Sequence, residues 1–234
     1  MRWAFLMLPL LSCAARAERG GAERLRWAVH YLGLPVGEAQ VDITGAEGSW
    51  RATARARSAA WYRPVYDLDD QLTSVGGPGG DAVYLTRLRE GGFHQDQRMT
   101  FGPRAVSVHR RQRFSDGWRD WTDTYAVEGP VHDPVAALLA LRRLDLDEGA
   151  RYTVPVFTGS RTAPVEVAVG AASPCETAWG PRACVPLTMT GQSADKEPQS
   201  LWVTITDDAD RLPLEVVVQT PAFKVRAALS AWTP

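Results

Sequence analysis

The sequence predicts a mainly β fold, in which about a dozen strands form one large curved antiparallel sheet, a half-barrel or a barrel, with one packed helix. Three observations lead to this fold class. Apolar and polar residues alternate along most of the chain, as in strands that bury one face. Clusters of glycine and proline, such as 76–80 and 91–92, separate the alternating segments. A single segment, 133–143, has the composition of a buried helix instead.

The predicted strands begin close to the N-terminus. In the first one, Leu25, Trp27 and Val29 alternate with Arg24 and Arg26, so one face is apolar and the other is charged. The same alternation predicts, in chain order, strands at 25–31, 39–43, 50–56, 70–75, 82–90, 94–101, 105–114, 120–127, 151–157, 162–171, 183–190, 200–206, 214–219 and 225–231. Short strands at this regular spacing favour one antiparallel sheet that curls or closes.

The helix near 133–143 carries its own start and stop signals. Asp133 is a good N-cap residue, and Pro134 suits the first helical position. We expect Arg142 and Arg143 to close the last turn, where cations interact favourably with the helix dipole. Because the segment is apolar on most faces, we expect it to pack against the sheet. A second short helix, or a turn, is expected at 59–66.

The N-terminus has the build of a secretory signal. Arg2 is followed by an apolar run at 3–11, and the small-x-small site at 15–17 precedes Glu18. The apolar run is too short to span a bilayer. We therefore predict a signal peptide at 1–17, a single antiparallel β domain at 18–234, and a periplasmic or otherwise exported protein.

An alternative interpretation of the same segment is a lipoprotein signal. Residues 10–13 resemble a lipobox, in which Cys13 would become the lipidated N-terminus after removal of 1–12. Several acyl chains on Cys13 would anchor the protein durably in a membrane, in this case the outer membrane. Without that modification we expect no membrane partner.

The remaining cysteines, Cys175 and Cys184, are predicted to form a disulfide. In an oxidising compartment a close pair is typical of a structural bridge. The turn signal at 179–181 lies between them, so the bridge would join the two strands of a hairpin. A redox-active pair is the alternative, but the C-x-x-C spacing is absent.

Charge and motif content exclude several functional classes. The chain has 26 basic and 27 acidic residues, so no excess positive charge favours nucleic acid. The sequence contains none of the short motifs of serine hydrolases, zinc proteases or nucleotide-binding loops. His94 and His109 could meet across a hairpin, but two histidines do not complete a metal site. We therefore predict no catalytic residue, no metal and no cofactor.

Two further clusters of side chains have more than one interpretation. The arginines between 87 and 119 could line one face of the sheet and offer guanidinium groups to carboxylates or phosphates. A solvated outer face, neutralised by nearby aspartates, is the favoured interpretation. Aromatic residues could line a ligand site, although most tryptophans are expected in the core. The ligand-lining candidates are Trp61, Tyr62, Tyr66, Trp118 and Trp121.

The order of these features resembles that of a known bacterial family, the domain-of-unknown-function family 3108, whose members are exported and mainly β. The similarity covers most of residues 25–230. The segments that carry it are the strand-turn-strand at 31–37, the acidic lead-in at 65–70, the hairpin at 90–92, the helix at 133–143 with Gly149, and the strand, acidic turn and Leu-Pro start at 202–213. The resemblance implies the fold and no activity. The architecture is also similar, more loosely, to that of periplasmic carriers of lipoproteins.

These observations favour a non-enzymatic protein of the bacterial cell envelope. We expect it to bind a hydrophobic ligand, such as a lipid, an acyl chain or a lipoprotein segment, during transport or envelope assembly. The alternative is an interaction or sensor module that binds another envelope protein without a small-molecule cavity. An enzyme acting on glycans or lipids ranks third, and it would need Asp67 or Asp70 to face Asp207 across a cleft.

Overall fold

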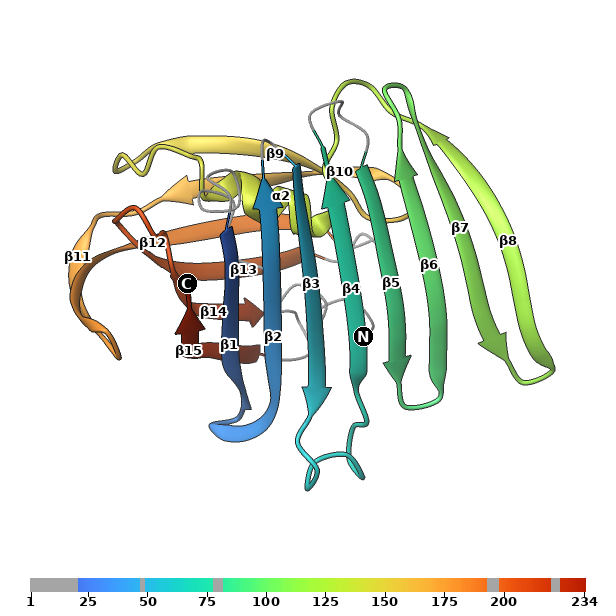
Figure 1. The fold of residues 1–234 in the computed structure, drawn as a ribbon, viewed down its shortest axis with the longest axis horizontal. Coiled ribbons are helices and arrows are strands. Elements are labelled where there is room, and N and C mark those ends of the chain that lie inside the picture. Colours follow the sequence, from blue (N-terminus) through green and yellow to red (C-terminus); the bar gives the residue numbers. More distant parts are fainter. Residues whose placement is uncertain (1–20, 47–48, 78–81, 193–197, 220–223) are drawn as a thin grey trace.

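A computed structural model describes residues 21–46, 49–77, 82–192, 198–219 and 224–234 (Figure 1). The predicted signal at 1–17 and the alternative lipidation site Cys13 lie outside the described residues. In the part of the chain that is described, no helix has the length and apolarity that a membrane span requires.

Within the described residues, fifteen strands form a single antiparallel sheet that is strongly curved and not closed. The strand order is β8-β7-β6-β5-β4-β3-β2-β1-β15-β14-β13-β12-β10-β9, and β11 pairs with β12 beside this path. The strands are β1 (Gly21–Tyr31), β2 (Leu34–Ala46), β3 (Ser49–Ser58), β4 (Asp69–Gly76), β5 (Ala82–Glu90), β6 (Phe93–Phe101), β7 (Ala105–Phe114), β8 (Gly117–Ala126), β9 (Arg151–Phe157), β10 (Thr162–Val169), β11 (Ser173–Thr177), β12 (Gly180–Gln192), β13 (Pro198–Thr206), β14 (Pro213–Gln219) and β15 (Lys224–Thr233). The mainly β prediction is confirmed.

The first and last strands of the described residues pair with each other in the middle of the sheet. Strands β1 and β15 pair over eight residue pairs, from Arg24 opposite Thr233 to Tyr31 opposite Val225. This pairing joins the long strands β1–β8 to the second half, β9–β15, most of whose strands run across the first half in Figure 1. The indole of Trp27, which is 1% exposed, donates a hydrogen bond of 3.0 Å to the Pro213 carbonyl and holds the two halves together.

Alternation along each strand decides which face is buried. In β1 the side chains of Leu25, Trp27 and Val29 point into the curved sheet, while Arg24 and Arg26 remain exposed outside. Close strand packing also requires glycine at one inner position. A Cβ at Gly37 would lie 2.5 Å from the Arg57 carbonyl oxygen, so a larger residue there would push β2 away from β3.

Helix α2 (Pro134–Leu141) lies inside the curve of the sheet, where it contacts β4 and β9. Asp133 caps its N-terminus by accepting hydrogen bonds from the backbone N–H groups of Val135 (2.8 Å) and Ala136 (3.0 Å). Most residues of the helix are buried, which confirms the predicted packing: Pro134, Val135, Ala137, Leu138, Leu139 and Leu141.

The expected dipole role of the arginines in this helix is wrong. The last turn of α2 contains no basic residue, because the helix ends at Leu141. Arg142 is the C-cap and is only 3% exposed. Its guanidinium Nη1 lies 3.5 Å from a carboxylate oxygen of the buried Glu23, so Arg142 serves a buried ion pair with β1.

The segment 59–66 forms turns, so the turn alternative is confirmed there. Two i to i+4 hydrogen bonds occur, Arg63 N–H to Ala59 (3.1 Å) and Tyr66 N–H to Tyr62 (3.0 Å). They do not extend into a helix because Pro64 has no N–H to donate.

The predicted hairpin around the two cysteines is present as β11 and β12, and Cys175 and Cys184 form a disulfide across it. Their Cα atoms are 5.8 Å apart, which is ordinary for a bridge between neighbouring strands. Because β11 pairs with no strand other than β12 among the described residues, the bridge fixes a hairpin beside the main path of the sheet.

Removal of the disulfide is expected to lower the free energy of unfolding without changing the fold. The bridge closes a loop with a sequence separation of 9, and the chain-entropy model gives a loss of about 2 to 3 kcal/mol for a loop of this size. The measurement is urea denaturation of the protein and of the Cys175→Ser, Cys184→Ser double variant, with and without reductant. An unfolding midpoint that reductant leaves unchanged in the unsubstituted protein, despite full reduction, would contradict this prediction.

Candidate functional site

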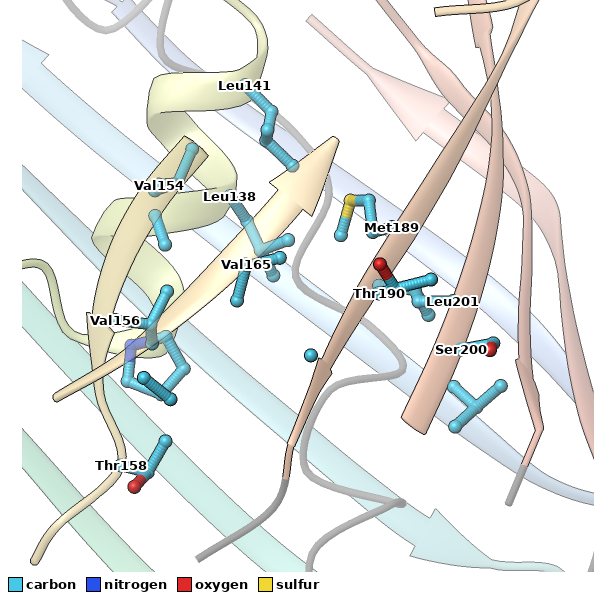
Figure 2. Close-up of a pocket in the computed structure, with 15 residues that line it drawn as sticks. Leu138, Leu141, Val154, Val156, Thr158, Val165, Met189, Thr190, Ser200 and Leu201 are labelled. Carbon is cyan, nitrogen blue, oxygen red and sulfur yellow. The ribbon is translucent and has the colours of Figure 1, made fainter. Parts of the chain in front are cut away.

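The main candidate site is an apolar pocket between α2 and the second half of the sheet (Figure 2). Its volume is about 70 Å³. In Figure 2 the side chains of Leu138 and Leu141 extend from α2 toward Val165 and Met189. The lining residues come from α2, from five strands and from the β9–β10 turn: Pro134, Ala137, Leu138, Leu141, Val154, Val156, Thr158, Ala163, Val165, Met189, Thr190, Gly191, Ser200, Leu201 and Val218.

The pocket has a buried apolar floor and a more polar rim. Leu138, Leu141 and Val218 are each no more than 3% exposed, whereas Thr190 is exposed and Ser200 is half-buried. None of the lining residues is ionisable. A concave apolar surface with a few polar groups at its mouth is the usual composition of a small-ligand site. The arrangement can hold a hydrophobic group, but it offers no acid, base or nucleophile for chemistry at its floor.

The first anchor of α2 is a buried carboxylate at its N-terminus. Asp133 is 1% exposed and accepts a hydrogen bond of 2.6 Å from the Ser74 hydroxyl on β4. Burial raises the pKa of Asp133 to about 6, although the bonds from Ser74 and from the helix N–H groups favour the ionised form. Its neighbour His132 extends the sheet, because its backbone N–H donates to Pro155 (3.0 Å) and its carbonyl accepts from Phe157 (2.8 Å).

The second anchor lies at the C-terminal end of α2. The Arg142 guanidinium donates to the Asp210 carbonyl in the β13–β14 turn and faces the Glu23 carboxylate. Glu23 in turn accepts a hydrogen bond of 2.6 Å from the Trp232 indole of β15. Each end of the helix is thus tied by buried polar groups to a different part of the sheet, so the pocket wall formed by α2 has a fixed position.

The opposite part of the interior is polar. On the inner faces of β4, β5 and β6 the buried side chains include Asp70, Glu90 and Gln97. The Tyr66 hydroxyl donates to Glu90 at 3.0 Å, and Asp70 accepts from the Arg89 N–H at 2.8 Å. Burial raises the pKa of Asp70 to about 6, so this carboxyl group takes up a proton more readily than an exposed aspartate.

Two tyrosines border this polar interior. Burial raises the pKa of Tyr66 well above its usual value, and the Glu90 charge adds to the shift. Tyr84 is completely buried, and burial followed by the charge of Asp133 raises its pKa as well. Both phenols therefore stay neutral at any physiological pH.

The aromatic residues that the sequence predicted as ligand-lining candidates do not line the apolar pocket. Tyr62 and Tyr66 face a much smaller space at the ends of β2 and β3. Trp61 is 55% exposed, and its indole donates to the Pro35 carbonyl at 3.2 Å. The two tryptophans of β8 lie on opposite faces of the sheet. Trp118 is exposed on the outer face, and Trp121 is half-buried on the inner face.

Of the aspartates considered for an enzyme site, Asp70 is buried on β4 and Asp207 lies in the β13–β14 turn. Asp208 stabilises the β13–β14 turn by accepting hydrogen bonds from the backbone N–H groups of Asp210 (2.9 Å) and Arg211 (3.1 Å), as expected for a turn that bonds its own backbone. Asp207 pairs with the Arg211 guanidinium at 3.0 Å. Within the described ranges, no group of three or more His, Cys, Asp or Glu side chains has the geometry to hold a metal ion.

Sequence reasoning missed the pocket residues, although it predicted the elements that carry them. Leu138 and Leu141 belong to the predicted helix, and Met189 and Leu201 occupy inner positions of two predicted strands. The sequence did contain one signal for an apolar pocket, which is that the inner positions of the last six strands carry no charged residue. Which of these positions would meet around a gap depends on the strand order, which alternation does not specify.

Comparison with known proteins supports the fold. The family model described as a protein of unknown function, DUF3108, matches residues 26–226, so the resemblance predicted from the motifs is confirmed. No curated protein matches the sequence. The crystal structure of a β-barrel-like protein of the domain of unknown function DUF1849 from Brucella abortus matches with a TM-score of 0.66 and 12% identity, covering 90% of this chain and 96% of that chain. A likeness at this identity shows the fold alone.

The buried carboxylate of Asp133 is expected to make stability depend on pH. Because its pKa of about 6 exceeds the usual value of 3.8, the folded state binds a proton more readily than the unfolded state between these values. The stabilisation is fully present below about pH 4 and is lost as the pH rises through 6, by about 2 to 3 kcal/mol. The free energy of unfolding, measured by urea denaturation between pH 4 and 7.5, should therefore fall less steeply with pH for Asp133→Asn than for the unsubstituted protein. This variant keeps the capping oxygen. Parallel pH profiles for the variant and the unsubstituted protein would contradict the assignment.

Proposed function

The chain belongs to the DUF3108 family, and we propose that it binds a hydrophobic ligand in the pocket beneath α2. The ligand is an acyl chain of a lipid or lipoprotein, and the protein carries it or presents it during envelope assembly without transforming it. The observation that supports this proposal most directly is the pocket itself, which combines an apolar floor, a partly polar mouth and lining residues that are not ionisable.

The size and polarity of the pocket suit the end of a hydrocarbon chain. A single water molecule needs about 10 to 15 Å³ measured in the same way, and the pocket offers about 70 Å³. Apolar cavities of this kind give water no hydrogen-bond partners, whereas each buried methylene gains about 0.8 kcal/mol. The chain end would occupy the floor, and its polar group would lie near Thr190 and Ser200 at the rim.

The proposal places the protein in the periplasm, or on the outer membrane if Cys13 is acylated. The disulfide between Cys175 and Cys184 supports an oxidising compartment, because such bridges are rare in reducing ones. The intact mass of the mature protein distinguishes a start at Glu18 from an acylated start at Cys13.

Native mass spectrometry of protein purified from its own envelope, without added detergent, tests the proposal. We expect an excess mass that disappears on denaturation and fragments as an acyl chain. A bare polypeptide mass in every preparation, together with no saturable binding of the fluorescent fatty acid cis-parinaric acid, would overturn it.

Filling the pocket should abolish binding without harming the fold. Leu138→Trp adds ring atoms where the space lies, so we expect cis-parinaric acid to bind at least about tenfold more weakly, with an unchanged or higher unfolding midpoint. Leu138→Met conserves volume and is the matched control, with affinity close to that of the unsubstituted protein. Equal affinity for both variants would show that the probe binds elsewhere.

A second candidate function is suggested by the edge of the sheet. Strand β8 is the terminal strand, and among the described residues its only strand partner is β7. Its ten residues could pair with an extended segment of another envelope protein by β-augmentation. If native mass spectrometry finds no ligand, this function becomes the leading one.

Hydrogen–deuterium exchange tests the edge directly. An envelope protein that adds a strand should slow amide exchange in β8 when a solubilised envelope fraction is added, while β3, which is paired on both sides, should show no change. Unaltered exchange in β8 would contradict this second function.

A further inference from the structure

The outer face of the sheet carries arginines whose pairing differs between its two parts. Over β1–β4 three of the five outward arginines pair with an outward carboxylate on the neighbouring strand. Arg55 forms a bidentate pair with Asp69 at 2.7 Å, and the other two pairs are Arg24 with Asp42 and Arg57 with Glu38. Most of the charge on this part of the face is therefore paired, and it corresponds to the solvated outer face that the sequence favoured.

Over β5–β8 the excess of outward arginine over outward carboxylate is larger. The outward charged side chains here are Arg87, Arg89, Arg98, Arg111, Arg113, Asp96 and Asp120. Asp96 accepts a bond of 2.6 Å from Arg89, and Asp120 lies 3.9 Å from Arg111. Within the described residues, neither Arg87 nor Arg98 forms an ion pair within 4.0 Å.

The strand register gathers these arginines around one carboxylate. Asp96 on β6 lies directly between Arg87 on β5 and Arg111 on β7. Arg98 is the next outward residue on β6 and stands between Leu85 and His109. Diagonal neighbours on one sheet face are about 7 to 8 Å apart, which long side chains bridge. Two aspartates thus serve four neighbouring arginines: Asp96 pairs with Arg89, and Asp120 pairs with Arg111.

A groove follows the same strands. Its volume is about 520 Å³, and it is open to solvent along the outer face. Its lining is Leu85, Thr86, Arg87, Arg89, Asp96, Gln97, Arg98, His109 and Arg111. The Arg111 and Arg89 guanidinium carbons lie 4.9 and 5.8 Å from the centre of the exposed Trp118 ring, which holds two of the arginines at one end of the groove.

The chemistry of the groove favours phosphate over other anions. Each guanidinium presents a planar fork of donors that matches two oxygens of a phosphate or carboxylate. Arg87, Arg98 and Arg111 together offer more donors than Asp96 and Asp120 can accept. A phosphate monoester carries about two charges and three terminal oxygens at neutral pH, so it can satisfy several forks together.

We propose that the groove over β5–β7 binds a phosphate monoester group, with Arg87, Arg98 and Arg111 as its ligands. The monoester belongs either to a free phosphorylated metabolite or to a lipid headgroup, which share this chemistry. The site is separate from the pocket beneath α2, because it lies on the outer face of the sheet, and it does not depend on the function proposed for that pocket.

Titration at constant ionic strength tests the proposal with three probes: inorganic phosphate, glycerol 3-phosphate, and phosphatidylcholine vesicles containing phosphatidate. For the soluble probes we expect saturable changes in backbone NMR shifts confined to β5–β7, and for the vesicles co-sedimentation. Binding of glycerol 3-phosphate identifies a free ligand as the source, and binding of phosphatidate vesicles alone identifies a headgroup. Absence of saturation up to about 10 mM of the soluble probes, together with no co-sedimentation, would overturn the proposal.

Substitutions distinguish binding at a specific arginine site from a general attraction of anions to positive charge. The double variant with Arg87→Gln and Arg98→Gln should have an affinity lower by about tenfold or more for whichever probe binds the unsubstituted protein. Arg26→Gln with Arg51→Gln is the matched control, since it removes the same charge from exposed outer positions of β1 and β3, and it should change affinity less than about twofold. Arg87→Lys with Arg98→Lys keeps the charge and removes the forks, so affinity should also fall. Equal losses in the first two variants, or full affinity in the lysine variant, would show that no specific site exists.

Discussion

The burial of α2 inside an open sheet is the constraint on which the rest of the structure depends. Fifteen strands curve without closing, so their inner faces need a further element to cover them. The helix does this with apolar residues on nearly all sides, and it is held by Asp133 at one end and Arg142 at the other. Buried charges of this kind cost desolvation free energy, and their main effect here is to fix the position of the helix.

Helix α2 has only eight residues and cannot fill the whole interior. It leaves space on both of its sides, and the two sides differ in polarity. On the side of β9–β14 the remaining space is apolar and becomes the pocket. On the side of β4–β7 polar side chains fill it, where Gln97 and Asp123 bond the Arg110 guanidinium, which also donates to the Gly159 carbonyl in the β9–β10 turn. The open gap between the sheet ends is therefore bridged by polar contacts, while the apolar pocket stays on the far side of α2.

Alternation predicts the strands of this fold well because each strand buries one face, and Asp133-Pro134 marks the helix start without ambiguity. Strand order follows from contacts between distant segments, such as Trp27 with Pro213, and no local pattern contains that information. The candidate site was missed for the same reason. Aromatic side chains such as Trp61 suggested a ligand site by type, whereas the pocket is formed by aliphatic residues that resemble ordinary core positions until α2 leaves a gap beside them.

The two free edges of the sheet are protected in different ways, and the difference bears on function. The β9 edge is covered by the backbone of His132, which bonds Pro155 and Phe157. The β8 edge has no such cover among the described residues, but its sequence places Arg119, Asp120 and Asp123 along it. Charged side chains on an edge discourage pairing between copies of the same chain. A charged edge of this kind favours a strand with complementary charges over a second copy of the same chain, which is the pairing that the second candidate function requires.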